Sequence, residues 1–143
     1  MKWRQIKVLD KMGFEVANHT RNHTAVNFLS KEQFIYELNY IEDKCDSLDI
    51  AKPSTFAFPG YALNDSAIYI RQKKGYQLAR AGVSRAYDPL IDHPLLVPSW
   101  AMTANNKQQI MWAFNEARNG KIVVLIIQGV PDVEHPWVNT PPA

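Results

Sequence analysis

The chain has 143 residues, which is enough for one domain with a hydrophobic core and too few for two domains of ordinary size. Hydrophobic residues make up 46% of it and charged residues 21%, a balance typical of a globular domain. The formal net charge of +2 is too small to indicate nucleic acid or an anionic membrane surface as a partner.

The first predicted element is a helix, because Trp3, Ile6 and Leu9 recur at helical spacing and Gly13 is suited to end it. This opening stretch is mixed in charge and has no apolar segment of a signal peptide, and the sequence leaves the compartment open. No capping residue precedes the helix, and we therefore expect the chain to begin within a domain. A short strand over residues 14–17 and a polar loop should follow.

A second helix is predicted from Ser30, which forms a capping box with Gln33, and its apolar stripe continues to Leu48. Cys45 is the only cysteine of the chain and lies in this stripe. A single cysteine cannot form an internal disulfide, so the sequence carries no sign of an oxidising compartment. We expect Cys45 to be a buried structural thiol rather than a nucleophile.

The middle of the chain is divided into short elements by proline and glycine, which end strands and helices. In chain order we predict a strand at 55–58 ended by Pro59-Gly60, a helix capped by Asn64 or Asp65 and ended before Gly75, a strand at 77–81, a loop at 82–94 and a strand at 95–97.

A last helix is predicted from Asn105 or Asn106 to the Asn119-Gly120 pair. The run 122–127 is apolar and mostly β-branched, which predicts a buried strand, and it is too short to cross a membrane. The proline-rich end, from 131 to 142, predicts a loop. Strands that alternate with helices favour the α/β class, with a parallel sheet or barrel.

His19 and His23 are the first candidates for a functional site. They are four residues apart, a spacing at which two imidazoles can face one metal ion on a helical turn or in a tight loop. Both follow a predicted strand, where α/β folds place their chemistry. An isolated pair of histidines in a polar loop is more often simply solvated, so the pair alone does not decide between a metal site and a surface loop.

Residues 13–23 read Gly-Phe-Glu-Val-Ala-Asn-His-Thr-Arg-Asn-His. This segment resembles the second motif of the polysaccharide deacetylases (carbohydrate esterase family four), in which a Gly-x-Glu strand runs into Asn-His-Ser/Thr-x-x-His. Both histidines of that motif bind a divalent metal, usually zinc. The resemblance therefore implies that His19 and His23 are metal ligands and that the cofactor is a divalent metal, with zinc expected.

Further segments resemble later motifs of that family. Residues 55–60, Thr-Phe-Ala-Phe-Pro-Gly, resemble the third motif, which implies that Phe58, Pro59 and Gly60 line a substrate groove; an ordinary strand and turn is the alternative. Val-Pro-Ser-Trp at 97–100 resembles the wall of the acetyl pocket more loosely, and Trp100 is either substrate-binding or plain core.

Residues 126–128, Ile-Ile-Gln, align with the family's last motif, an apolar strand that ends in a catalytic histidine. Gln128 stands at this general-acid position, and its amide can donate a hydrogen bond but cannot deliver a proton. In the loop that follows, Asp132 and His135 either bind sugar, substitute for a missing catalytic group, or are ordinary loop residues beside a proline turn.

The first motif of the family, an Asp-Asp pair upstream of the first helix, has no counterpart here, because Asp10 lies within the predicted helix. The resemblance therefore implies a single partial domain over residues 1–143, with the fold of an incomplete, distorted (β/α) barrel. A barrel without its first strands would expose sheet edges, and we expect association into homo-oligomers through them.

Two functions follow from the resemblance. One is a metal-dependent hydrolase that acts on carbon–nitrogen bonds other than peptide bonds and removes acetyl groups from N-acetylated or O-acetylated polysaccharide, this chain being a fragment or weakly active. The other is a non-catalytic carbohydrate-binding or structural relative. In both cases the expected partner is an acetylated carbohydrate, with no nucleic acid and no membrane span.

Overall fold

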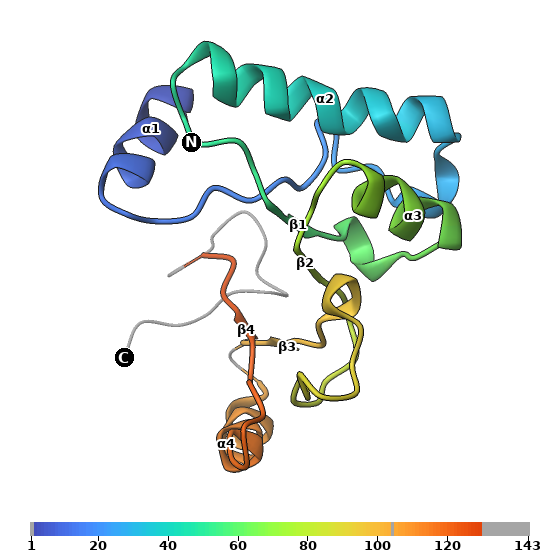
Figure 1. Cartoon of the computed structure of the whole chain (residues 1–143). Helices are drawn as coiled ribbons and strands as arrows, with labels where there is room; N and C mark the ends of the chain where they lie inside the picture. Colours follow the sequence, from blue (N-terminus) through green and yellow to red (C-terminus); the bar gives the residue numbers. More distant parts are fainter. Residues whose placement is uncertain (1, 104, 130–143) are drawn as a thin grey trace. The chain divides into compact units, whose positions relative to one another are not determined.

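The computed structural model describes residues 2–103 and 105–129 (Figure 1). The chain falls into two compact units, Met1–Ala81 and Gly82–Ala143, which are described separately below. Both units contain helices and strands, as the sequence predicts, but in the first unit two helices follow each other before the first strand. None of the described helices is both long and apolar enough to cross a bilayer.

The first unit contains three α-helices and two short strands. The helices are α1 (Trp3–Lys11), α2 (Lys31–Ser47) and α3 (Asp65–Lys73), and the strands are β1 (Thr55–Ala57) and β2 (Leu78–Arg80). Short 3-10 turns precede α2 and follow β1, at Val26–Phe28 and Pro59–Tyr61. All three helices confirm the prediction from the sequence, and both strands lie inside the predicted ranges.

Side chains cap the N-termini of α2 and α3, as the sequence predicts. Ser30 Oγ accepts a hydrogen bond from the Gln33 amide at 3.2 Å, and Gln33 Oε1 accepts one from the Ser30 amide at 2.8 Å. This reciprocal pair satisfies two amides at the start of α2. Asn64 Oδ1 accepts from the Ala67 amide at 2.7 Å and caps α3 in the same way.

The strands β1 and β2 pair in parallel, with Phe56 opposite Ala79. Residues 14–17 do not form the strand that we expected. Pairing begins only at Asn18, which forms one parallel bridge with Phe56, and the Phe14 side chain is 59% exposed. Because Phe14 has no core to pack against, its apolar character does not hold this segment in a sheet.

Aromatic side chains form the core of the first unit. The Phe56 ring makes edge-to-face contacts with Phe34, Phe58 and Tyr76, with centroids 5.9, 5.3 and 6.2 Å apart. Such contacts add to the stabilisation from burial. Cys45 on α2 is fully buried, which confirms the prediction of a buried thiol.

Arg71 is an unusual member of this core. Its side chain is fully buried on α3, and its guanidinium carbon lies 3.8 Å from the centre of the Phe58 ring and 4.9 Å from that of Phe56. In the described part of the chain, none of its three guanidinium nitrogens has a hydrogen-bond partner. Burial lowers the pKa of Arg71 to about 9, because the charged form is poorly solvated there.

The second unit contains α4 (Lys107–Glu116) and the strands β3 (Trp100–Ala101) and β4 (Leu125–Ile126), which pair in parallel. The prediction of a strand at 95–97 is wrong. Pro94–Leu96 is a 3-10 turn, which His93 Nδ1 caps by accepting from the Leu95 amide at 3.0 Å. Proline fixes the backbone angle that suits the start of such a turn.

The run 122–127 is a strand over two residues rather than six, and it is not fully buried. Ile122 forms an isolated antiparallel bridge with Tyr87, and the ends of the run, Ile122 and Ile127, are 50% and 55% exposed. Each sheet of the described residues has two strands, and none of them closes into a barrel. The barrel therefore stays a prediction, as does association through the open edges.

Candidate functional site

The two candidate histidines lie side by side just after the bridge that Asn18 makes with β1. Their ring centroids are 4.7 Å apart, and the planes are inclined by 74°. His19 is half-buried and His23 is exposed. Two imidazoles at this separation can both reach one ion, and the exposed ring leaves the pair open to solvent.

A backbone contact orients His19. Its Nδ1 lies 2.7 Å from the carbonyl oxygen of Ala57 in β1. A carbonyl oxygen only accepts hydrogen bonds, so Nδ1 carries the proton and Nε2 has a free lone pair. Burial lowers the pKa of His19, the Ala57 bond opposes this, and the nearby His23 and Arg80 lower it further. The neutral form, which binds metals, is thus favoured.

The segment between the histidines has strained backbone. Thr20 has φ of +65° and His23 has φ of +55°, in the left-handed region that residues other than glycine rarely adopt. Such residues cost about 1–3 kcal/mol each and persist where surrounding contacts hold them. At one end of the segment, Asn18 Oδ1 accepts from the Thr20 amide at 3.0 Å.

A buried network holds Asn18 in turn. Its Nδ2 donates to the Leu38 carbonyl at 3.1 Å and to the Tyr76 hydroxyl at 2.8 Å. The Tyr76 hydroxyl donates to Glu42 Oε1 at 2.9 Å, and burial together with Glu42 raises the pKa of Tyr76. Sequence analysis missed this network, because each of its hydrogen bonds joins residues that are 20 or more positions apart and no local pattern links them.

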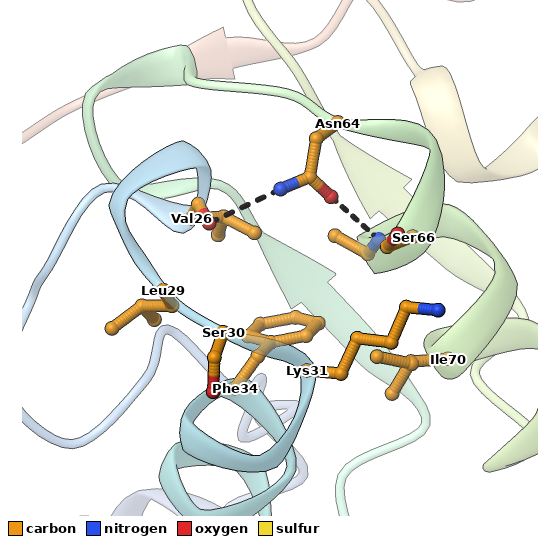
Figure 2. Close-up of a pocket in the computed structure, with 9 residues that line it drawn as sticks. Val26, Leu29, Ser30, Lys31, Phe34, Asn64, Ser66 and Ile70 are labelled. Carbon is orange, nitrogen blue, oxygen red and sulfur yellow. Dashed lines mark hydrogen bonds between the residues drawn. The ribbon is translucent and has the colours of Figure 1, made fainter.

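The loop after His23 is tied to α3 beside a small cavity of about 220 Å³ (Figure 2). Asn64 Nδ2 donates to the Val26 carbonyl at 3.2 Å, while its oxygen caps α3. Figure 2 shows the Asn64 side chain between Val26 and the first turn of α3. Neither His19 nor His23 lines the cavity.

His19 and His23 together provide two nitrogen ligands, which is part of what a metal site needs. In the described ranges 2–103 and 105–129, no group of three or more His, Cys, Asp and Glu side chains is placed to hold an ion. Catalytic zinc sites use three protein ligands and keep one position open. His19 and His23 fit two of these ligands, with His19 oriented by a second contact as metal-bound histidines are.

The other predicted site residues are spread over both units. Phe58 and Pro59 are buried, whereas Gly60 is exposed in the turn after β1, with φ of +58°. In the second unit Trp100 is partly buried in β3, and Gln128 is exposed after β4. Asp132 and His135 lie outside the described residues.

A family model described as polysaccharide deacetylase matches residues 1–79, more than half of the chain. The chain belongs to the polysaccharide deacetylase family. This confirms the resemblance found in the motifs around His19 and the Phe58 turn. The polysaccharide deacetylase family is generally metal-dependent. A search of curated proteins returned no match.

Two solved structures resemble this family member. The Streptococcus pyogenes deacetylase PplD in complex with acetate is 18% identical, with a TM-score of 0.68 over 79% of this chain and 50% of that chain. A family 4 carbohydrate esterase from Streptomyces lividans in complex with acetate is 19% identical, with a TM-score of 0.56 over 86% and 56%. The likeness shows the fold, and this chain spans about half the length of both structures.

Proposed function

We propose that this polysaccharide deacetylase family member acts in the metal-dependent hydrolysis of acetyl groups from N-acetylated or O-acetylated polysaccharide. The observation that carries the proposal is the imidazole pair of His19 and His23, 4.7 Å apart, with the Nδ1 proton of His19 directed to Ala57. The family match over residues 1–79 includes both histidines.

In this proposal His19 Nε2 and an imidazole nitrogen of His23 hold a divalent cation, with zinc expected. The bound metal supplies polarisation of the acetyl carbonyl and a lowered pKa of water. The Ala57 carbonyl keeps His19 in the tautomer that has its lone pair on Nε2. The turn at Phe58, Pro59 and Gly60 directly follows Ala57 in the chain, which supports a place for it beside the substrate.

We expect turnover by this chain alone to be very low. Gln128, at the position of the family's general acid, has no proton to deliver at neutral pH. The described residues bring no third ligand to the histidine pair. Loss of a general acid or base lowers the rate by about a hundred- to ten-thousand-fold. The glutamine also favours a second candidate, a non-catalytic relative that binds acetylated carbohydrate.

Zinc titration by isothermal calorimetry tests the metal site. His19→Ala and His23→Ala should each abolish the binding that the parent chain shows, whereas His93→Asn should not alter it. His93 is a matched control because it is an exposed histidine of the second unit, and asparagine keeps an acceptor for the Leu95 amide. A parent chain that binds zinc no better than the His19→Ala, His23→Ala double variant would refute the proposal.

Acetate release from chitin oligomers, with and without added zinc, separates the two candidates. Zinc-dependent release, even when slow, and its loss in His19→Ala would support the hydrolase. Zinc binding and oligomer binding without any release would favour the non-catalytic relative. Gln128→His should increase a slow release, because it restores a side chain that can deliver a proton.

A further inference from the structure

Glu37 on α2 accepts two hydrogen bonds from the loop between the two histidines. Its Oε2 accepts from the backbone amide of Asn22 at 2.8 Å, and its Oε1 accepts from Asn22 Nδ2 at 2.7 Å. Both carboxylate oxygens thus accept hydrogen bonds from the same residue, and together they fix the backbone and the side chain of Asn22. Hydrogen bonds to a charged acceptor are stronger than neutral ones.

The burial of Glu37 shows that this contact is built into the fold. Only 5% of the residue is exposed, although glutamate is rarely buried unless it is paired. An exposed carboxylate on a helix could exchange its bonds to the loop for bonds to water, whereas the Glu37 carboxylate is buried against the loop. Since a buried carboxylate without partners is strongly disfavoured, Asn22 and Glu37 hold each other in place.

The position of Asn22 gives the contact its consequence for the site. Asn22 directly precedes His23, whose φ of +55° is left-handed. Thr20, two residues before Asn22, also has a left-handed φ, of +65°. Strained backbone of this kind relaxes unless several contacts determine it. Asn18 holds the Thr20 end from within the same segment, and Glu37 holds the His23 end from α2.

We propose that Glu37 is a positioning residue, which holds His23 beside His19 by fixing Asn22 and so sets the geometry of the pair for a metal. Its importance for a metal rests on the proposed function, but its effect on the loop does not. Direct hydrogen-bond partners of metal ligands typically change metal affinity by about 10- to 100-fold when replaced, and we expect an effect of this order for Glu37, which acts through Asn22.

Four variants of the full chain test this inference. Glu37→Ala removes both acceptors, and Glu37→Gln keeps one of them. Glu32→Gln removes the same charge from an exposed residue of α2. Leu38→Ala opens the core at the neighbouring, fully buried position and lowers stability without removing a contact to Asn22.

The first readout needs no metal. In NMR spectra, Glu37→Ala should speed hydrogen exchange of the Asn22 amide and abolish the cross-relaxation between the His19 and His23 rings, whereas Glu32→Gln and Leu38→Ala should keep both. The second readout is zinc affinity, which should fall by about 10- to 100-fold in Glu37→Ala and less in Glu37→Gln.

Unchanged ring contacts and Asn22 exchange in a folded Glu37→Ala would overturn the inference, and so would an equal loss in Leu38→Ala, since the effect would then be one of general stability. If Glu37→Ala fails to fold, Glu37→Gln decides by the same two readouts. A parent chain that binds no zinc refutes the proposed function, while the metal-free readout still judges Glu37.

Discussion

The two units of the chain use their apolar residues differently. In the first unit, Phe56 is 2% exposed and touches three other aromatic rings. In the second, the most apolar run of the chain forms a strand of two residues, and its end residues Ile122 and Ile127 are about half exposed. The family match at residues 1–79 ends within two residues of the boundary of the first unit.

Apolar character alone therefore does not determine whether a segment is buried. Phe56 is buried because the amphipathic helix α2 brings Phe34 against it in β1, where the two rings pack edge to face. The run at 122–127 has stronger β-propensity than any segment of the first unit, yet it pairs over two residues. Long-range packing partners, rather than local propensity, determine which segments are buried.

Truncation of one apolar side chain in each unit, by Phe56→Ala and Ile122→Ala, should separate the two units most clearly. Phe56→Ala should lower the free energy of unfolding by about 3–5 kcal/mol, as large core truncations do. Ile122→Ala should lower it by about 1 kcal/mol, because half of the side chain is already in water. Denaturant unfolding, with hydrogen exchange to assign each change to a unit, measures both. Equal losses would contradict the comparison.

A smaller effect of opposite sign is expected at Arg71. Arg71→Met keeps the length of the side chain and its contact with Phe58 but removes a buried charge that has no hydrogen-bond partner in the described part of the chain. The variant should be more stable by about 1–3 kcal/mol, since isolated buried charge is strongly disfavoured. Arg118→Met, at an exposed position, is the control for lost charge and should be neutral. A lower melting temperature for Arg71→Met would show that the ring contacts outweigh the burial of the charge.

The polar network of the first unit should contribute less than its aromatic core. Tyr76→Phe removes the hydroxyl that joins Asn18 Nδ2 to Glu42 Oε1 and leaves both groups short of a partner. We expect a loss of about 1–2 kcal/mol. Tyr69→Phe, at an exposed tyrosine, should leave stability unchanged. If the two variants behave alike, water replaces the hydroxyl of Tyr76 and the network is weaker than its geometry suggests.

The helix starts could be predicted because their causes are local. The capping box of Ser30 and Gln33 and the cap at Asn64 involve residues three apart, a spacing that a sequence displays directly. The histidine pair could also be found, since the two rings are four residues apart. The roles of Glu37 and Tyr76 could not be predicted, because their hydrogen bonds to Asn22 and Asn18 span 15 and 58 residues, respectively. The strands expected at 14–17 and 95–97 failed where packing and a proline turn overrode propensity.

A weaker effect should appear as a pH dependence of stability in the second unit. Hydrogen bonds from Arg85 and from the Asp88 amide lower the pKa of Asp92 to about 2. The folded state thus holds its carboxylate more firmly than the unfolded state does, and this stability is present above about pH 4 and lost as the pH falls through about 2. Acid unfolding of Asp92→Asn should lack this component. Carbon NMR of the Asp92 carboxyl measures its titration directly, and a midpoint near 4 would contradict the prediction.

The single thiol of the chain offers a way to time the opening of the first unit. Cys45 is fully buried on α2, the helix that also bears Glu37, and burial raises its pKa. A thiol-specific reagent needs an exposed thiolate, so alkylation can proceed only when this part of the helix separates from the core. The alkylation rate under native conditions therefore reports the equilibrium for that opening. With one cysteine in the sequence, the signal needs no further substitution.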